Sequence, residues 1–296
     1  MIELTYNKKT EYSGTLCLGF FDCAHIGHVK LIQKAKEFGG DVFVFTFSND
    51  LTSFLHGKNG YIYSYSERLT RLEEEGVYGV VAAQFDDKFM NLSKETFLDG
   101  LVNTMNITRI ICGKDYTFGQ KASGDTQFLK EYFKKRKIAV EVVELVQIDG
   151  VKASTTYAKE LLKNGEIEKL NKLLVKPYRV SGIVKKGNQI GATIGFPTAN
   201  IEVPTGQTRI KQGVYAGYAT VLGKRYKAII NAGARPTLNS EEYKIESFID
   251  GEFGELYGAH IVVEFIFKIR DIQKFESLEK LKEQLKVDIK EMEKLL

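Results

Sequence analysis

The segment from Gly19 to His28 holds the most informative group of reactive side chains, because His25 and His28 flank Gly27 there. An apolar run of strand length precedes it, and apolar residues at helical spacing follow it. The pattern therefore predicts a strand that turns into a helix. A helix N-terminus favours an anion, since its first N–H groups lack intrahelical partners and its dipole is positive. We predict a phosphate site in which Gly27 permits close approach and both imidazoles add donors.

Such a site suits attack on the α-phosphate of a nucleoside triphosphate. Negative charge must be held in place there, and a nucleophile that is already a phosphate needs no base. A metal site is the alternative, because histidines three positions apart on a helix can bind zinc. A structural zinc site needs four ligands, however, and the only other histidines are His56 and His260.

The composition of the whole chain sets limits on its class. Its 296 residues suffice for two domains, and 42 basic against 38 acidic residues give a net charge of only +4. Nothing here calls for nucleic acid or a membrane as a partner. The three cysteines lack metal-binding spacing, and we expect them to be reduced. No apolar stretch has transmembrane length and no signal core begins the chain, so we expect the cytoplasm.

The first 175 residues alternate strand-like and helix-like segments. This order predicts an α/β domain with a doubly wound parallel sheet, whose ligands bind beyond the carboxyl ends of the strands. Residues 19–28 and 113–119 fall at such ends. Besides the segments around residue 19, the predicted strands are 41–47, 79–85, 109–113 and 139–146, and the predicted helices are 66–75, 93–104 and 126–137.

Residues 176–296 have a different pattern. Short alternating segments are separated by Gly, Asn and Pro, and one helix over 277–296 closes the chain. This pattern predicts a small antiparallel β-barrel domain with a C-terminal helix. The predicted strands are 178–184, 213–222, 226–230, 243–249 and 260–269.

A glycine-rich stretch in the second domain could wrap phosphates. Gly187, Gly191 and Gly195 recur every four residues, which gives the backbone the freedom that such a loop needs. Just after them, Thr198 and Asn200 offer the hard oxygens that suit Mg²⁺. The chain has no Walker sequence, so it is not a P-loop enzyme. On the spacing alone, these glycines could equally form ordinary turns.

Glu246 and the segment 154–156 each allow a functional interpretation and a purely structural one. Glu246 shares a face of its predicted strand with Phe248 and could approach a cavity, yet alternation alone also fits an ordinary surface carboxylate. Ser154, Thr155 and Thr156 precede a helix that begins near Tyr157. Their hydroxyls could meet phosphate oxygens or simply cap that helix.

Together these motifs resemble the bacterial bifunctional riboflavin kinase/FAD synthetase family along nearly the whole chain. The first domain resembles the HxGH nucleotidyltransferases, and the second resembles flavokinases. The sequence Gly-Phe-Pro-Thr-Ala-Asn is far more specific than HxGH. The matching segments are 19–22, 25–28, 66–69, 85–89, 112–119 and 154–156 in the first domain, and 195–200, 213–216, 231–237, Glu246 and 256–258 in the second.

The resemblance implies an ATP- and Mg²⁺-dependent enzyme. Its second domain would phosphorylate riboflavin to FMN with Glu246 as the base, and its first would adenylate FMN to FAD and release pyrophosphate. His25 and His28 would steady the triphosphate, and Asp115 would lie near FMN and the nucleotide. The other binding residues would be Gly19, Phe21, Asp22, Gly27, Ser154, Thr155, Thr156 and Lys159 for adenylyl transfer, and Gly187, Gly191, Gly195, Thr198 and Asn200 for the kinase. No obligate protein partner is implied.

Three departures from the family pattern fall in the first domain. No proline follows Phe47, Cys23 stands where glycine is common, and Lys159 replaces an arginine, so phosphate meets a point charge and not a bidentate fork. The alternatives are therefore a kinase with a degenerate first domain, an FAD synthetase alone, or a non-catalytic flavin- or nucleotide-binding regulator. A small-molecule cytidylyltransferase would leave the flavokinase motif unexplained.

Overall fold

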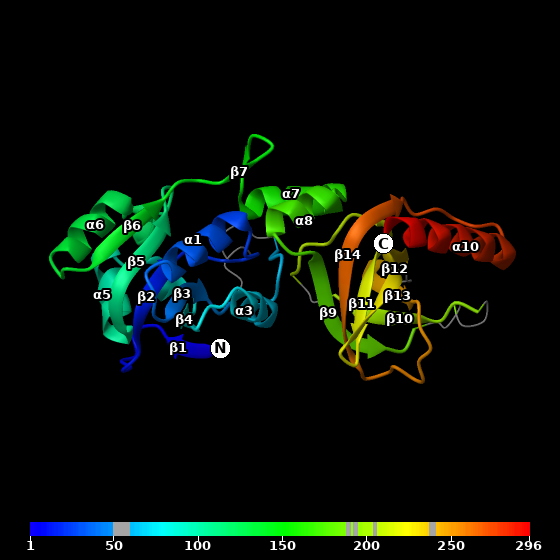
Figure 1. Ribbon diagram of the computed structural model, residues 1–296, viewed down its shortest axis with the longest axis horizontal. Coiled ribbons are helices and arrows are strands. Elements are labelled where there is room, and N and C mark those ends of the chain that lie inside the picture. Colours follow the sequence, from blue (N-terminus) through cyan, green and yellow to red (C-terminus); the bar gives the residue numbers. More distant parts are fainter. Residues whose placement is uncertain (50–59, 188–190, 192–194, 204–205, 237–240) are drawn as a thin grey trace. The chain divides into compact units, whose positions relative to one another are not determined.

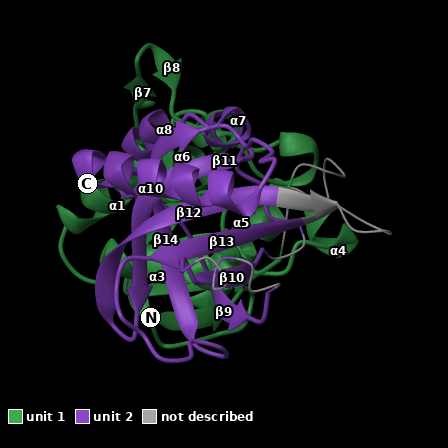
Figure 2. Cartoon of the chain, turned by 90° about the vertical axis from the view of Figure 1, so that its right-hand side faces the viewer, with its two compact units in different colours: residues 1–157 green, residues 158–296 purple. Residues whose placement is uncertain are grey.

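The computed structural model describes residues 1–49, 60–187, 191, 195–203, 206–236 and 241–296. The chain divides into two compact units, Met1–Tyr157 and Ala158–Leu296 (Figure 2). The predicted domain boundary after residue 175 stays a prediction. Parts of the proline-free segment after Phe47 and of the glycine-rich loop, as well as His56 and Thr237, lie outside the described residues.

The first unit contains a parallel sheet with the strand order β1-β4-β3-β2-β5-β6, which confirms the predicted α/β class (Figure 1). The run of Val and Phe in the central strand β3 suits burial on both faces of the sheet. The strands are β1 Ile2–Thr5, β2 Ser13–Leu18, β3 Val42–Phe47, β4 Gly79–Ala83, β5 Asn106–Gly113 and β6 Ala139–Val143.

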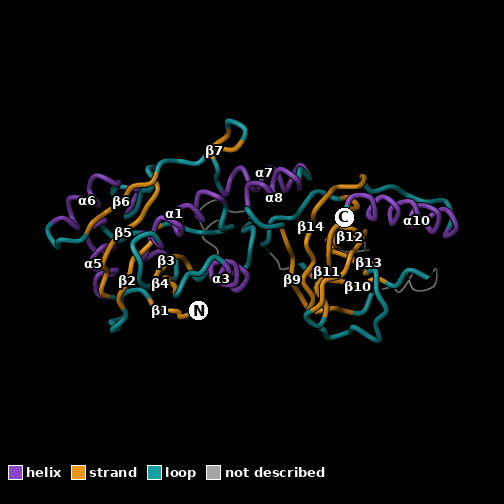
Figure 3. The backbone as a smooth tube through the Cα atoms, viewed as in Figure 1, coloured by secondary structure: helices purple, strands orange, loops and turns teal. Residues whose placement is uncertain are grey.

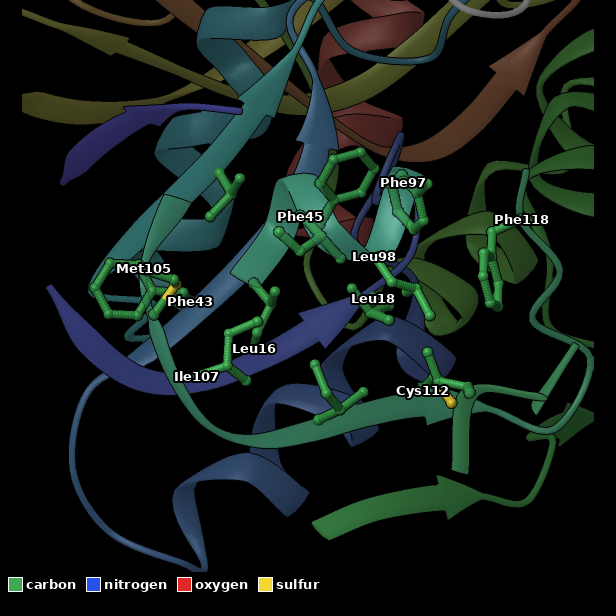
Figure 4. Close-up of a cluster of buried hydrophobic side chains, with 14 of the residues drawn as sticks. Leu16, Leu18, Phe43, Phe45, Phe97, Leu98, Met105, Ile107, Cys112 and Phe118 are labelled. Atoms are coloured by element: carbon green, nitrogen blue, oxygen red, sulfur yellow. The ribbon is translucent and has the colours of Figure 1, made fainter. Parts of the chain in front are cut away.

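Helices cover both faces of this sheet. Side chains of α1 and α3 pack on one face with Cys17 and Val44, whereas those of α5 and α6 pack on the other with Leu16 and Phe45 (Figure 4). The alternation of strand side chains between faces separates these two cores. The helices are α1 Ile26–Lys36, α3 Tyr65–Glu74, α4 Asp87–Met90, α5 Lys94–Thr104 and α6 Thr126–Lys134, with a 3-10 turn η1 at Gln120–Ala122.

Strands β2 and β5 are neighbours in the middle of the sheet. The loops that follow them, after Leu18 and after Gly113, therefore leave the same edge of the sheet side by side. As predicted, both proposed ligand segments begin at this edge.

Two strand features of the first unit escaped the sequence prediction, as did the short helix α4 and the turn η1. The short strand β1 joins the edge of the sheet beside β4, and a two-stranded hairpin, β7 Gln147–Ile148 and β8 Val151–Lys152, follows β6. Strands this short leave too few residues for a periodic pattern to be recognised.

The second unit contains a closed barrel in which every paired strand is antiparallel, as predicted. Its order is β10-β13-β12-β11-β14-β9. The sequence analysis missed β10, because its residues were interpreted only as a binding motif, and it made β12 too short. The strands are β9 Tyr178–Lys185, β10 Thr198–Glu202, β11 Gly213–Val221, β12 Lys224–Pro236, β13 Glu241–Ile249 and β14 His260–Arg270.

Helix α10, Leu278–Leu295, packs against the outer face of the barrel (Figure 3). Met292 is fully buried there beside Val214, Ala216 and Ile229. Ser277 begins the helix by accepting a hydrogen bond from the backbone N–H of Lys280. Helices α7, Thr155–Asn164, and α8, Ile167–Leu174, precede the barrel in the chain. No helix among the described residues is long and apolar enough to cross a membrane.

Candidate active sites

A cavity of about 780 Å³ opens at the carboxyl edge of the first unit's sheet. The loops after β2 and β5 contribute to its wall, as do the β7–β8 hairpin and the start of α7. Of the first-domain residues predicted from sequence, the cavity lining includes Gly19, His25, Gly27, His28, Asp115, Ser154 and Thr155. The structure thus brings together groups that lie more than 120 positions apart in the chain.

His25 is the N-cap of α1. Its Nδ1 accepts hydrogen bonds from the backbone N–H groups of Gly27, at 3.1 Å, and of His28, at 3.3 Å. The sequence analysis did not foresee this cap, in which a side chain satisfies donors that the helix itself leaves without partners. The phosphate contact at this helix N-terminus stays a prediction. Since Nδ1 acts as acceptor, the proton of the neutral His25 ring is on Nε2.

The two imidazoles are neutral in the folded protein. Burial lowers the pKa of His25 to about 4, and burial together with the neighbouring His25 lowers the pKa of His28 well below its usual value. Their rings stack with centroids 3.7 Å apart and planes inclined by 15°. The pair therefore offers hydrogen-bond donors to an anion, but no positive charge.

The two glycines of this segment have steric roles. An added Cβ at Gly27 would lie 3.0 Å from His25 Cε1, so the absence of a side chain leaves room for the capping imidazole. An added Cβ at Gly19 would lie 2.9 Å from the Phe21 ring. Gly27 also lines the cavity, and the close approach of its backbone to an anion stays a prediction.

Phe21 and Asp22 are fully buried and do not belong to the cavity lining among the described residues. Phe21 has a left-handed backbone, with φ of 55°, and its ring lies 4.5 Å from that of His28. Both residues belong to the turn into α1, and the Phe21 ring packs against His28. Contact with a ligand stays a prediction for both.

Two of the three residues in the Ser-Thr-Thr segment line the cavity. Ser154 caps α7 by accepting a hydrogen bond from Tyr157 N at 3.2 Å, and Thr155 Oγ1 lies 3.8 Å from Cys23 Sγ. Ser154 and Thr155 also line the cavity, so capping and ligand contact are compatible. Thr156 is exposed, and neither it nor Lys159 is part of the described lining.

One charged residue of this cavity was missed by the sequence analysis. Lys152, on β8, forms an ion pair with Asp115, in the loop after β5, and both line the cavity. Asp115 raises the pKa of His25 and Lys152 lowers it, so both charges act on the histidine pair. A single lysine in a short hairpin has no sequence signature that would have identified it.

Aromatic side chains form another part of the same cavity. Phe47 packs edge-on against both Phe85 and Phe89 with ring centroids 5.2 Å apart, and the centroids of Phe97 and Phe118 are separated by 5.5 Å. All five rings line the cavity. A planar apolar ring system fits such a wall. Phenylalanines at the end of β3 and just after β4 were the available signal, but they were treated only as core residues or as part of a motif.

The second unit contains a separate cavity of about 320 Å³ on the outer face of its barrel. Asn200 on β10 and Asn231 on β12 lie directly opposite Glu246 on β13, one on each side. Opposed residues of neighbouring strands point to the same face, and all three line this cavity. Phe248 lines it as well, which confirms the shared face predicted for Glu246 and Phe248.

The glycines before β10 pack closely around the Thr198–Asn200 segment. An added Cβ at Gly187 would lie 2.4 Å from Asn200 Nδ2, and one at Gly191 would lie 2.2 Å from the carbonyl oxygen of Phe196. Gly195 has a φ of +86°, which disfavours any other residue. Gly191 and Thr198 line the cavity, whereas the described lining does not include Gly187 or Gly195.

The side chain of Asn200 is suited to a hard cation. Its Oδ1 is buried and has no hydrogen-bond partner among the described residues, while its Nδ2 donates to Thr198 O at 3.4 Å. A buried oxygen without a partner is costly unless a ligand satisfies it. No cluster of three or more His, Cys, Asp or Glu that could hold a metal occurs in the described part of the chain. Mg²⁺ needs no such cluster, because it keeps waters and binds substrate phosphates.

Helix α10 supplies the apolar side of this cavity through Leu281 and Leu285. Asp288 on the same helix is fully buried and forms a bidentate pair with Arg270 at the end of β14, with distances of 2.9 Å to Nε and 2.8 Å to Nη2. Gln284 donates a further hydrogen bond to Asp288 at 2.9 Å. This buried pair fastens the helix beside the cavity.

Fold and sites together define a two-domain transferase that joins an HxGH nucleotidyltransferase-type α/β unit to a flavokinase-type barrel. Family models agree: the FAD synthetase model matches residues 7–157, and the riboflavin kinase model matches residues 174–296. The chain belongs to the bifunctional riboflavin kinase/FMN adenylyltransferase family.

Similar proteins cover nearly the full length. Bifunctional riboflavin kinase/FMN adenylyltransferases from Bacillus subtilis and Haemophilus influenzae are 31% and 33% identical, over 96% and 93% of this chain and 93% and 91% of their own. The Escherichia coli K12 relative is 32% identical over 92% of this chain and 90% of its own. A solved Streptococcus pneumoniae structure, described as a macrolide-efflux protein, has a TM-score of 0.90 and 28% identity and covers 99% of both chains.

Proposed function

We propose that this chain makes FAD from riboflavin in two steps at two separate sites. The second unit phosphorylates riboflavin to FMN, and the first unit adenylates FMN to FAD with release of pyrophosphate. The observation that carries this proposal is the presence of two cavities, each built from residues of its own unit and each lined by the reactive motif residues of that unit.

In the kinase step, Glu246 is the general base. Its carboxylate accepts the proton of the terminal ribityl hydroxyl, whose oxygen attacks the γ-phosphorus of ATP while the bond to the β-phosphate oxygen breaks and ADP leaves. Asn200 and Asn231 stand on either side of Glu246 in the cavity and orient the reacting groups. The isoalloxazine ring packs against Phe248 and the leucines of α10.

Thr198 and Asn200 are the residues that would hold Mg²⁺. The buried Oδ1 of Asn200, which has no hydrogen-bond partner among the described residues, supports this assignment. When bound there, the cation would neutralise negative charge on the ATP phosphates. Gly187 and Gly191 serve this arrangement by leaving room for the Asn200 carboxamide and the Phe196 carbonyl.

In the adenylyl step, a phosphate oxygen of FMN attacks the α-phosphorus of ATP. A new bond forms between them, and the bond to the β-phosphate oxygen breaks as pyrophosphate leaves with its electron pair. His25 and His28 donate hydrogen bonds to the triphosphate as neutral rings, which supports positioning and not proton transfer. The flavin ring packs against the part of the cavity wall formed by Phe47, Phe85 and Phe89.

The enzyme works in a reducing cytoplasm, a proposal supported by three free, buried cysteine thiols. Purified protein supplied with riboflavin, ATP and Mg²⁺ tests the proposed function, with flavins separated by chromatography over time. FMN should form first and FAD should follow. FMN alone would contradict adenylyl transfer, and FAD from supplied FMN but no product from riboflavin would contradict the kinase step.

A further inference from the structure

The cavity of the first unit is lined by cationic side chains as well as by the two neutral histidines. Adenylyl transfer releases pyrophosphate, so negative charge builds up on the β-phosphate oxygen as the bond to the α-phosphorus breaks. Positive charge placed at the developing anion is a large part of catalysis of this kind. His25 and His28 are neutral and do not supply this charge, whereas cationic side chains that line the cavity can add to it.

Two lysines line the cavity, Lys121 and Lys152. Lys121 lies in the turn η1 next to Gly119, where an added Cβ at Gly119 would be 2.8 Å from Lys94 Cα, so this turn packs against the start of α5. Lys152 instead pairs with Asp115 at the edge formed by the loop after β5, near the histidine pair. Lys159, which the family pattern suggests for phosphate, is not part of the described lining.

We infer that Lys152 is a catalytic residue of the first unit. Its ammonium group binds the β- and γ-phosphates of ATP and then the leaving pyrophosphate. Asp115 holds its ammonium group at the cavity when no nucleotide is bound. This inference rests on the proposed adenylyl transfer and assigns one residue to its leaving group.

The ion pair is suited to such an exchange of partners. The side chains of Lys152 and Asp115 are 48% and 47% exposed, and ion pairs this exposed contribute little to stability. A polyphosphate carries several negative charges, so it competes well with one solvated carboxylate. Lys152 also sits in a two-residue strand of a hairpin and has a long, rotatable side chain.

The test is the KM for ATP in forward FAD synthesis, and for pyrophosphate in the reverse reaction of FAD with pyrophosphate. Lys152→Ala should raise both KM values by roughly tenfold or more, since it removes a charge-assisted hydrogen bond. Lys152→Arg should restore most of the loss. Urea unfolding, measured on the same samples, reports that the first unit of each variant is folded, and FMN formation from riboflavin reports the second.

Lys114→Ala is the matched control. Lys114 lies in the same loop as Asp115 and pairs with Glu144 at 3.2 Å, but the described lining does not include it. Removing its charge should change either KM by less than about twofold. Equal losses in Lys114→Ala and Lys152→Ala, or unchanged KM values in Lys152→Ala, would overturn the inference. If the unsubstituted enzyme makes FMN but no FAD, the proposed adenylyl transfer fails, and the inference with it.

Discussion

At the scale of single residues, His25 performs two tasks with its two ring nitrogens. Nδ1 caps α1 through Gly27 and His28, which leaves Nε2–H as the only donor for a ligand. The cap fixes both the tautomer and the direction of the ring, so the donor is in place before a ligand arrives. The histidine pattern could be recognised from sequence, but the cap could not, because it depends on how the side chain folds back over Gly27.

The buried histidines make folding sensitive to acid. Because burial lowers the pKa of His25 from 6.5 to about 4, the unfolded chain binds a proton before the folded chain does. The free energy of unfolding should therefore fall as the pH falls from about 6.5 to about 4. His25→Asn keeps a good N-cap but cannot titrate, so its stability should decline less steeply.

Urea unfolding at a series of pH values measures this slope. His260→Asn is the matched control, since His260 is exposed at the start of β14, and it should decline as the unsubstituted protein does. Identical pH dependence in His25→Asn and the unsubstituted protein would show that His25 does not titrate on unfolding.

At the scale of elements, α10 depends on the Arg270–Asp288 pair for its position over the kinase cavity. Asp288→Asn should lower the free energy of unfolding by about 3–5 kcal/mol, because it leaves the Arg270 charge without its buried carboxylate. The KM for riboflavin should rise, since Leu281 and Leu285 on the same helix line the cavity. FAD formation from supplied FMN should be unaffected.

Glu283→Gln is the control for this helix. Glu283 pairs with Lys280 at 2.9 Å on the exposed face, and loss of that pair should cost less than about 1 kcal/mol. Urea unfolding and riboflavin kinetics compare the two variants. An Asp288→Asn enzyme with an unchanged KM for riboflavin would contradict a positioning role for the pair.

The spacing of apolar residues predicted the helices and strands that have a regular pattern of buried side chains. Helix α10 and strands β3 and β13 were identified to within two residues at each end, because their apolar spacing extends over several turns or pleats. Strand β10 was missed because Thr198 and Asn200 carry polar side chains toward a cavity, and these residues were interpreted only as a binding motif. The pairing of Lys152 with Asp115 depends on tertiary structure alone and left no trace in the sequence.

At the scale of the whole molecule, each of the two units is proposed to catalyse a different reaction of ATP. The first unit would break the bond between the α-phosphorus and the bridging oxygen of the β-phosphate, using neutral histidine donors and the Lys152 ammonium group. The second unit would transfer the terminal phosphate with a carboxylate base. Each cavity is lined only by described residues of its own unit. Loss of one site should therefore leave the chemistry of the other intact.

A cross of two variants against two substrates tests this separation most directly. Flavins are measured by chromatography after Glu246→Gln and His28→Ala enzymes receive either riboflavin or FMN, with ATP and Mg²⁺. Glu246→Gln should form no FMN from riboflavin yet convert supplied FMN to FAD at the unsubstituted rate, whereas His28→Ala should accumulate FMN and form little FAD. If either substitution abolished both reactions in a folded protein, the account of two independent sites would be contradicted.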